Sequence, residues 1–181
     1  MTKSQTASRL GIDNDPDEDA VENLTLVCEN ILEPVREYYD IPFSPSSGYR
    51  CPELNREVGS ADTSPHISGE AIDFEIPGVP NMGLAQWIMD NLDYDQLILE
   101  FYKEGEPNSG WVHCSYCGEG NRNDAKRFDG THWVALGVRE DGVLYNSYTC
   151  SACEGVGYCG FVFHWYCCQS STSSRNCGQN P

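Results

Sequence analysis

The sequence has few basic side chains and no long apolar stretch. It holds 11 Lys and Arg residues against 28 Asp and Glu residues, which gives a formal net charge of -17. Nucleic-acid binding and adhesion to anionic membranes both draw on cationic side chains, so this charge argues against either partner. The longest apolar-rich stretch free of charged residues, 155–168, is too short for a transmembrane helix. The sequence therefore predicts a soluble protein that binds no nucleic acid and no membrane.

The first residues, Met1 to Thr6, also lack the apolar segment of a secretory signal, so export by the standard route is not expected. Apolar side chains nevertheless make up 39% of the chain and aromatic ones 11%, which is enough for a folded core despite the charge. With 181 residues, the chain has room for one domain of moderate size and an appendage.

Helical and extended patterns alternate without the regular rhythm of a parallel α/β protein. Apolar residues at helical spacing between Val21 and Tyr38 predict one helix of roughly 20 residues, capped by Asp15 and bent near Pro34. Further patterns predict a helix at 52–58, a strand at 71–76, a helix capped by Asn81 and a hairpin of 96–102 with 111–115. Interspersed helices and antiparallel strands indicate an α+β fold.

Two of the four histidines lie in settings typical of metal ligands. His66 precedes Asp73 by seven positions, and Gly69 between them permits a tight turn, so a loop residue and a strand residue can converge on one ion. A third ligand, His113, would complete a zinc site with one open position for water. From the residues alone, this pattern predicts a zinc hydrolase.

The predicted hairpin adds a carboxylate to this group. If its turn is centred between Glu106 and Pro107, Glu100 lies directly across from His113 on the same face of the sheet. Glu100 interrupts an otherwise apolar strand, and a buried carboxylate needs a partner or a function. A solvated hairpin residue is the alternative explanation.

Several motifs in a fixed order surround these residues. They are Ser47-Gly48-Tyr49-Arg50, Leu54-Asn55, Ser64-x-His66-x-x-Gly69-x-Ala71-x-Asp73 and Trp111-Val112-His113. Over roughly residues 5–123 the sequence resembles the peptidase M15 family, the zinc D-Ala-D-Ala carboxypeptidases. The segments 6–14 and 97–102 resemble its compact, often bacteriophage-encoded branch.

The resemblance implies a fold and a division of the chain. Residues 1–123 would form an M15/hedgehog-like zinc peptidase domain, with a small antiparallel sheet and flanking helices, and residues 124–181 a cysteine-rich extension. Zn²⁺ would be the cofactor and peptidoglycan stem peptides the substrate.

The resemblance also implies roles for single residues. His66, Asp73 and His113 would be zinc ligands and Glu100 the general base. Arg50 would pair with a substrate carboxylate, whose geometry suits a guanidinium, and Ser64 would hold or polarise the substrate. A structural ion pair is the alternative for Arg50, and a turn hydroxyl is the alternative for Ser64.

Two positions depart from the family pattern. At the first, Pro65 stands where a polar residue is common in the compact branch, which would alter substrate contacts without removing metal binding. At the second, many relatives carry a catalytic carboxylate three residues before the last histidine, where this chain has Gly110, so the base must come from elsewhere. Glu100 is preferred over Glu104 and Glu106, which lie in the predicted turn. A carboxypeptidase is weakly preferred over an endopeptidase, because only a free C-terminus offers Arg50 a carboxylate.

The ten cysteines are unevenly placed, with Cys28 and Cys51 early and the other eight between Cys114 and Cys177. The pairs Cys114-x-x-Cys117 and Cys150-x-x-Cys153 could form a second, structural zinc site. Cys114 follows His113 directly, however, and should point to the opposite face of its strand. Four further cysteines, Cys159, Cys167, Cys168 and Cys177, bring this group to an even total of eight, so disulfides in an oxidising or virion-exposed setting are favoured over a second zinc.

Two functional hypotheses remain. The first is a phage-encoded zinc peptidase that degrades the bacterial cell wall during lysis or entry, located in the virion or in the host cytoplasm. The second is a virion structural protein, such as a tail or capsid accessory component, that uses the peptidase fold as a scaffold and contacts other virion proteins.

Overall fold

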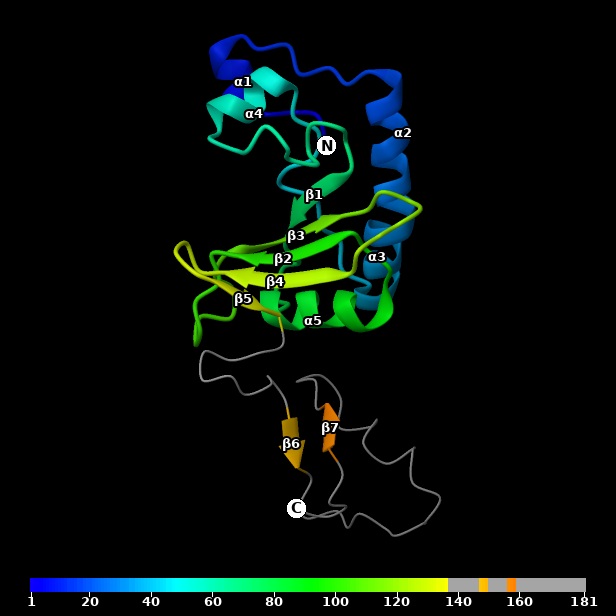
Figure 1. Ribbon diagram of the computed structural model, residues 1–181, viewed down its shortest axis with the longest axis vertical. Coiled ribbons are helices and arrows are strands. Elements are labelled where there is room, and N and C mark those ends of the chain that lie inside the picture. Colours follow the sequence, from blue (N-terminus) through cyan, green and yellow to red (C-terminus); the bar gives the residue numbers. More distant parts are fainter. Residues whose placement is uncertain (137–146, 150–155, 159–181) are drawn as a thin grey trace. The chain divides into compact units, whose positions relative to one another are not determined.

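The computed structural model describes residues 1–136 and two short strands at 147–149 and 156–158 (Figure 1). The chain divides into two units, Met1–Leu136 and Gly137–Pro181. The first unit continues past the expected boundary at residue 123, because β4 (Asp124–Phe128) and β5 (Trp133–Ala135) join its sheet. In the second unit, β6 (Ser147–Thr149) pairs with β7 (Val156–Tyr158).

The long N-terminal helical segment consists of three parts. α2 (Glu18–Val27) passes into a π-helical turn, η1 (Cys28–Leu32), and then into α3 (Glu33–Tyr39). The π turn lies immediately before Pro34, so the helix deviates where the proline predicts a bend. The predicted cap was wrong: the side chain of Asp17, not of Asp15, accepts the N–H of Ala20 at 2.9 Å.

A five-stranded sheet with the order β1-β3-β2-β4-β5 organises the first unit. β1 (Ala71–Phe74) and β2 (Gln96–Glu100) flank β3 (Trp111–Ser115), and both pair with it in antiparallel fashion. The β2–β4 pair is parallel, so the sheet is mixed rather than antiparallel throughout. The predicted α+β class is confirmed.

The two faces of this sheet differ in chemistry, because side chains alternate along each strand. One face packs on α5 (Asn81–Asn91) and the α2–α3 segment, and the strands contribute to this core Ile72, Phe74, Leu97, Leu99, Val112 and Cys114. The opposite face, which we call the site face, carries Asp73, His113, Ile98 and Glu100. The alternation predicted from sequence thus separates the core from the candidate site.

The predicted hairpin exists, but its predicted register was wrong. Glu100 pairs with Trp111, and His113 pairs with Ile98, so β2 is displaced by two residues from the expected alignment. A displacement of two residues leaves every side chain on its predicted face, because the period of a strand is two. Glu100 therefore shares the face of His113 without lying directly opposite it.

The β2–β3 connection explains this register. Gly110 has a left-handed φ of 68°, and a Cβ atom there would lie 1.8 Å from the carbonyl oxygen of Glu100. Asn81 was predicted to cap its helix, but its side chain instead donates to the carbonyl oxygen of Gly110 at 3.0 Å, and Pro80 takes the cap position. The helix α5 thereby holds the end of the connection.

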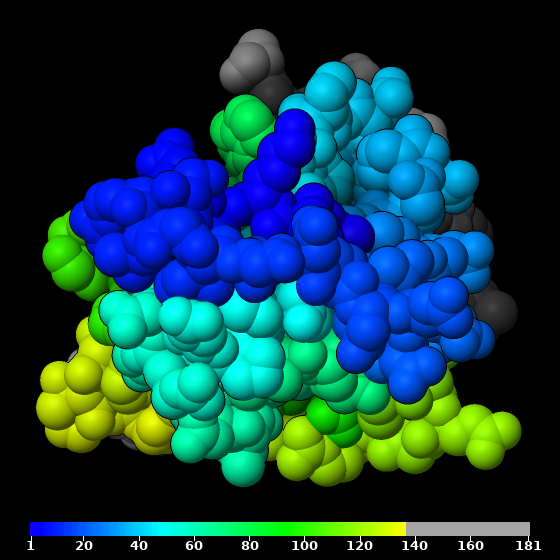
Figure 2. All heavy atoms as spheres, turned by 90° about the horizontal axis from the view of Figure 1, so that it is seen from above, coloured from blue at the N-terminus to red at the C-terminus, as the bar shows by residue number. Residues whose placement is uncertain are grey.

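The N-terminal residues pack against the segment that leads into α4 (Pro52–Glu57), and Figure 2 shows them lying across this end of the molecule. Asn14 makes the contact: its amide donates to the carbonyl oxygen of Tyr49 at 3.2 Å and accepts from the N–H of Cys51 at 2.7 Å. In the described part of the chain, no helix is long and apolar enough to cross a membrane.

Candidate metal centre

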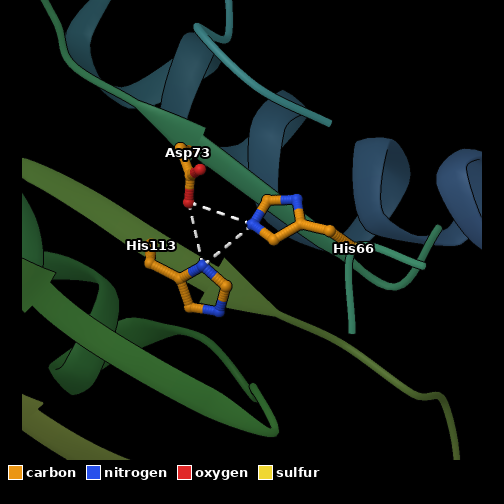
Figure 3. A group of neighbouring side chains, drawn as sticks. All are labelled: His66, Asp73 and His113. Carbon is orange, nitrogen blue, oxygen red and sulfur yellow. Dashed lines mark hydrogen bonds and ion pairs between the residues drawn. The ribbon is translucent and has the colours of Figure 1, made fainter. Parts of the chain in front are cut away.

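Three potential metal ligands from three parts of the chain meet on the site face (Figure 3). His66 lies in the turns between α4 and β1, and Asp73 and His113 are paired residues of β1 and β3. All three are buried, with 1%, 8% and 5% of their surfaces exposed. Gly69 adopts a φ of 78° against the backbone of Ala20, as the predicted tight turn requires.

The ligand atoms form a nearly equilateral triangle. Nε2 of His66 lies 3.2 Å from Oδ1 of Asp73 and 3.2 Å from Nδ1 of His113, and the remaining edge is 2.8 Å. Ligands bound at about 2.0–2.1 Å to a tetrahedral ion are separated by about 3.3 Å. The triangle is therefore close to one face of a zinc coordination tetrahedron. Among the described residues, no other group of this kind occurs.

The protonation of His66 follows from its other ring nitrogen. Nδ1 lies 2.7 Å from the carbonyl oxygen of Gly48, which can only accept, so Nδ1 carries the proton. In the neutral ring Nε2 is then unprotonated, and its lone pair faces the carboxylate of Asp73. Two acceptors at 3.2 Å repel each other unless a cation lies between them. A backbone carbonyl that orients a metal-binding histidine is a common feature of zinc sites.

The carboxylate of Asp73 is kept ionised. Burial alone would raise its pKa, but the interactions with His113 and His66 outweigh burial and hold the pKa well below the usual range. The pKa of His66 is lowered, chiefly by burial, although the neighbouring Asp73 opposes this shift. A charged carboxylate and a neutral imidazole are the forms that bind metal.

Arg50 lies at the edge of this group. One of its terminal nitrogens is 3.8 Å from Oδ2 of Asp73 and donates to the hydroxyl of Ser47 at 3.3 Å. Its Nε is buried without a hydrogen-bond partner. Burial lowers its pKa, and the charges of Asp73 and Glu100 oppose that effect. A guanidinium can donate hydrogen bonds to a substrate carboxylate.

Glu100 is half-buried at the end of β2 and makes no ion pair with Arg50 within 4.0 Å. Burial is the main cause that raises its pKa, while His113 lowers it and the charge of Asp73 raises it further. A carboxylate whose pKa is raised towards neutrality is a more effective proton acceptor than an ordinary surface glutamate.

Of the predicted site residues, Ser64 has the least direct connection to the metal ligands. Its hydroxyl accepts the backbone N–H of His66 at 3.4 Å, as expected for a residue that stabilises a turn. The structure thus connects Ser64 to the site through the backbone of a ligand.

The two described members of the cysteine pairs are separated. Cys114 is fully buried in the core, where burial raises the pKa of its thiol, and Cys117 is exposed. Cys28, Cys51, Cys114 and Cys117 are all free thiols. Cys150 and Cys153 lie outside the described residues. Cys114 points away from the site face, as its position after His113 predicts.

Sequence reasoning missed the residues that support the ligands. Gly48 orients His66, and the backbone of Ser47 exchanges hydrogen bonds with that of Asp73, at 3.0 and 3.3 Å. Asn14 fixes the chain next to both. Ser47 and Gly48 belong to a motif used for the family resemblance, but backbone carbonyls carry no residue-type signal of their own.

The fold and the buried His–Asp–His group define a protein with a candidate metal centre on one face of a mixed sheet. The model of the family Peptidase M15 matches residues 1–115, which include all three ligands. The chain belongs to the peptidase M15 family. A search of curated proteins finds no match.

Proposed function

We propose that this protein is a zinc peptidase that cleaves the stem peptides of peptidoglycan. The observation that carries the proposal is the convergence of Nε2 of His66 with Asp73 and Nδ1 of His113 in a buried triangle whose edges suit a bound cation. Two imidazoles and one carboxylate suit zinc, and three protein ligands with an open position are typical of catalytic sites. When bound there, zinc supplies an acidified water and polarises the peptide carbonyl.

The protein's own residues then have distinct tasks. Glu100 takes the proton of the attacking water and later transfers it to the leaving amine. Arg50 binds the substrate carboxylate through its guanidinium, and Ser64 keeps His66 in place. Since Arg50 needs a carboxylate partner, removal of a C-terminal D-Ala is preferred over cleavage inside a cross-link.

The biological setting is part of the same proposal. The resemblance of residues 6–14 and 97–102 to phage proteins supports an enzyme made for lysis or entry, which acts from the virion or the host cytoplasm on the cell wall. Virion proteins are its partners if the fold serves as an assembly scaffold instead.

Metal content and activity, measured on the same samples, test the proposal. Mass spectrometry of the purified wild type is expected to find about one zinc per chain, and the His66→Ala variant is expected to lose both zinc and peptidoglycan hydrolysis. His132→Ala is the control, because this histidine is exposed and pairs with Asp129, which is not part of the ligand triangle. A wild type without zinc or activity after zinc addition would favour the scaffold.

A further inference from the structure

Four aromatic side chains form a group beside Glu100, and we name Phe101, Trp111, Phe128 and Trp133 the aromatic row. Strand pairing places Trp111 on one side of Glu100 and Phe128 on the other, and Trp133 pairs with Phe128 on the next strand. The row therefore crosses the site face from β3 to β5, the last strand of the sheet (Figure 1).

The rings contact one another in sequence across the sheet. Phe128 and Trp133 stack with centroids 4.6 Å apart and an interplanar angle of 26°, and Phe101 lies 5.1 Å from Trp111 and 5.5 Å from Phe128. Trp133 remains 57% exposed and Phe101 44% exposed. These rings therefore present apolar surface to solvent instead of filling the core, which lies on the other face of the sheet.

The backbone of Phe101 is strained in a way that serves this arrangement. Its φ of 53° lies in the left-handed region, which side-chain-bearing residues rarely adopt. A regular strand would turn Phe101 away from the face of Glu100, whereas this conformation brings its ring between Trp111 and Phe128. Strain that persists beside a candidate active site indicates a functional constraint.

We propose that the aromatic row binds the glycan strand of peptidoglycan. This inference rests on the proposed function, because it assigns the part of that substrate that is not cleaved. The electron-rich face of an aromatic ring attracts the C–H groups on the flat face of a pyranose ring. An exposed stacked tryptophan offers such a face, and the interaction needs no positive charge from a protein of net charge -17.

The distance from Glu100 to Trp133 suits a substrate in which a peptide branches from a sugar. The two residues are separated by two strand spacings, or roughly 10 Å at about 4.8 Å each. About three extended residues span that length. A stem peptide with its scissile bond beside Glu100 can therefore place the sugar that carries it on the row.

The decisive comparison measures each variant on two substrates. Trp133→Ala is expected to reduce hydrolysis of intact sacculi about tenfold and to leave hydrolysis of a sugar-free stem peptide within about twofold. Tyr38→Ala is the matched control, because Tyr38 is 58% exposed and stacks on Trp87 at 4.5 Å and 25°, but belongs to α3. It is expected to change neither rate.

A binding measurement separates this proposal from the peptidase proposal. Purified glycan strands without peptides should bind the wild type and the Tyr38→Ala variant, and should bind Trp133→Ala at least about tenfold more weakly, whether or not the protein hydrolyses anything. Equal glycan binding by all three proteins would overturn the proposal. So would an equal loss on both substrates, which would assign the row to the stem peptide. A change in sedimentation with unchanged glycan binding would overturn it in favour of contacts with a second copy of the chain.

Discussion

Glu100 lies diagonally from His113 on the site face, because the residue directly opposite His113 is Ile98, two positions earlier in β2. Diagonal neighbours in a sheet are separated by about 7–8 Å between their α-carbons. Glu100 is accordingly not a member of the ligand triangle, which contains only His66, Asp73 and His113. This spacing leaves room for a water molecule between a metal ion and the carboxylate, as a general base requires.

Replacing Glu100 should separate catalysis from metal binding. We expect Glu100→Gln to lower kcat by about 10²–10⁴-fold, the usual contribution of a general base, with zinc content unchanged. Glu106→Gln, in the exposed β2–β3 connection, should keep kcat within about twofold. If both variants were equally active, Glu100 would not be the base.

The pH profile gives a second test of the same residue. The base must be ionised, so kcat/KM should rise with pH through the pKa of Glu100. Because burial raises that pKa, the acid limb should lie above the usual glutamate value of about 4.3. This limb should disappear in Glu100→Gln. An unchanged acid limb in the variant would assign it to another group.

Asp73→Asn should remove zinc while preserving the shape of the site. The amide lacks the negative charge and presents N–H groups towards the imidazoles, so zinc affinity should fall by more than about 100-fold, beyond the usual effect of outer-shell changes. Competition with a chelator measures the affinity. The exposed Asp62, changed to Asn, is the control, and zinc retention by Asp73→Asn would exclude it as a ligand.

Arg50→Lys tests which end of a peptide enters the site. A lysine keeps the charge but loses the planar fork, so KM should rise about tenfold for peptides with a free terminal carboxylate. Peptides with an amidated C-terminus should be little affected, and Arg56→Lys on α4 should change neither. An equal effect on both peptides would mean that Arg50 acts through Asp73, 3.8 Å away.

Gly110 cannot carry a side chain in this structure. The clash of a Cβ atom with the carbonyl oxygen of Glu100, added to the left-handed φ, should make Gly110→Ala less stable by about 2 kcal/mol or more in urea unfolding. Gly105→Ala has a positive φ of 86° but an open environment, so it measures strain without the clash. Equal losses in the two variants would contradict the role of this contact.

The cysteines should differ in reactivity. Cys117 is exposed and should be alkylated in the native protein, whereas Cys114 should react only after unfolding, because burial removes access and raises its thiol pKa. Mass spectrometry of digested protein locates the label. Cys117→Ser should leave zinc content unchanged. Protection of Cys117 until a chelator or a reductant is added would instead restore a metal or disulfide role.

The errors in the expected fold have physical causes. Asp13, Asp15 and Asp17 are alternative caps of the same type, and only the backbone conformation at Asp17, with its extended ψ of 177°, selects among them. The hairpin register was wrong because it placed the centre of the connection between Glu106 and Pro107, one position later than the strand pairing gives. Asn81 from α5, together with the left-handed Gly110, holds the connection two residues out of that alignment. The hydrogen bond from Asn81 to Gly110 joins residues 29 positions apart, so it cannot be read from the local sequence.

The sequence by itself determined the α+β class, the three ligand candidates and the face on which Glu100 lies, because ligand chemistry and strand alternation are local properties. The tertiary structure alone decided that the carbonyl oxygen of Gly48 accepts a hydrogen bond from Nδ1 of His66 and so leaves Nε2 of that ring to face Asp73. It also decided that four aromatic rings from β2 to β5 meet beside Glu100. These features depend on which strands become neighbours, and strand order is set by packing of the whole sheet.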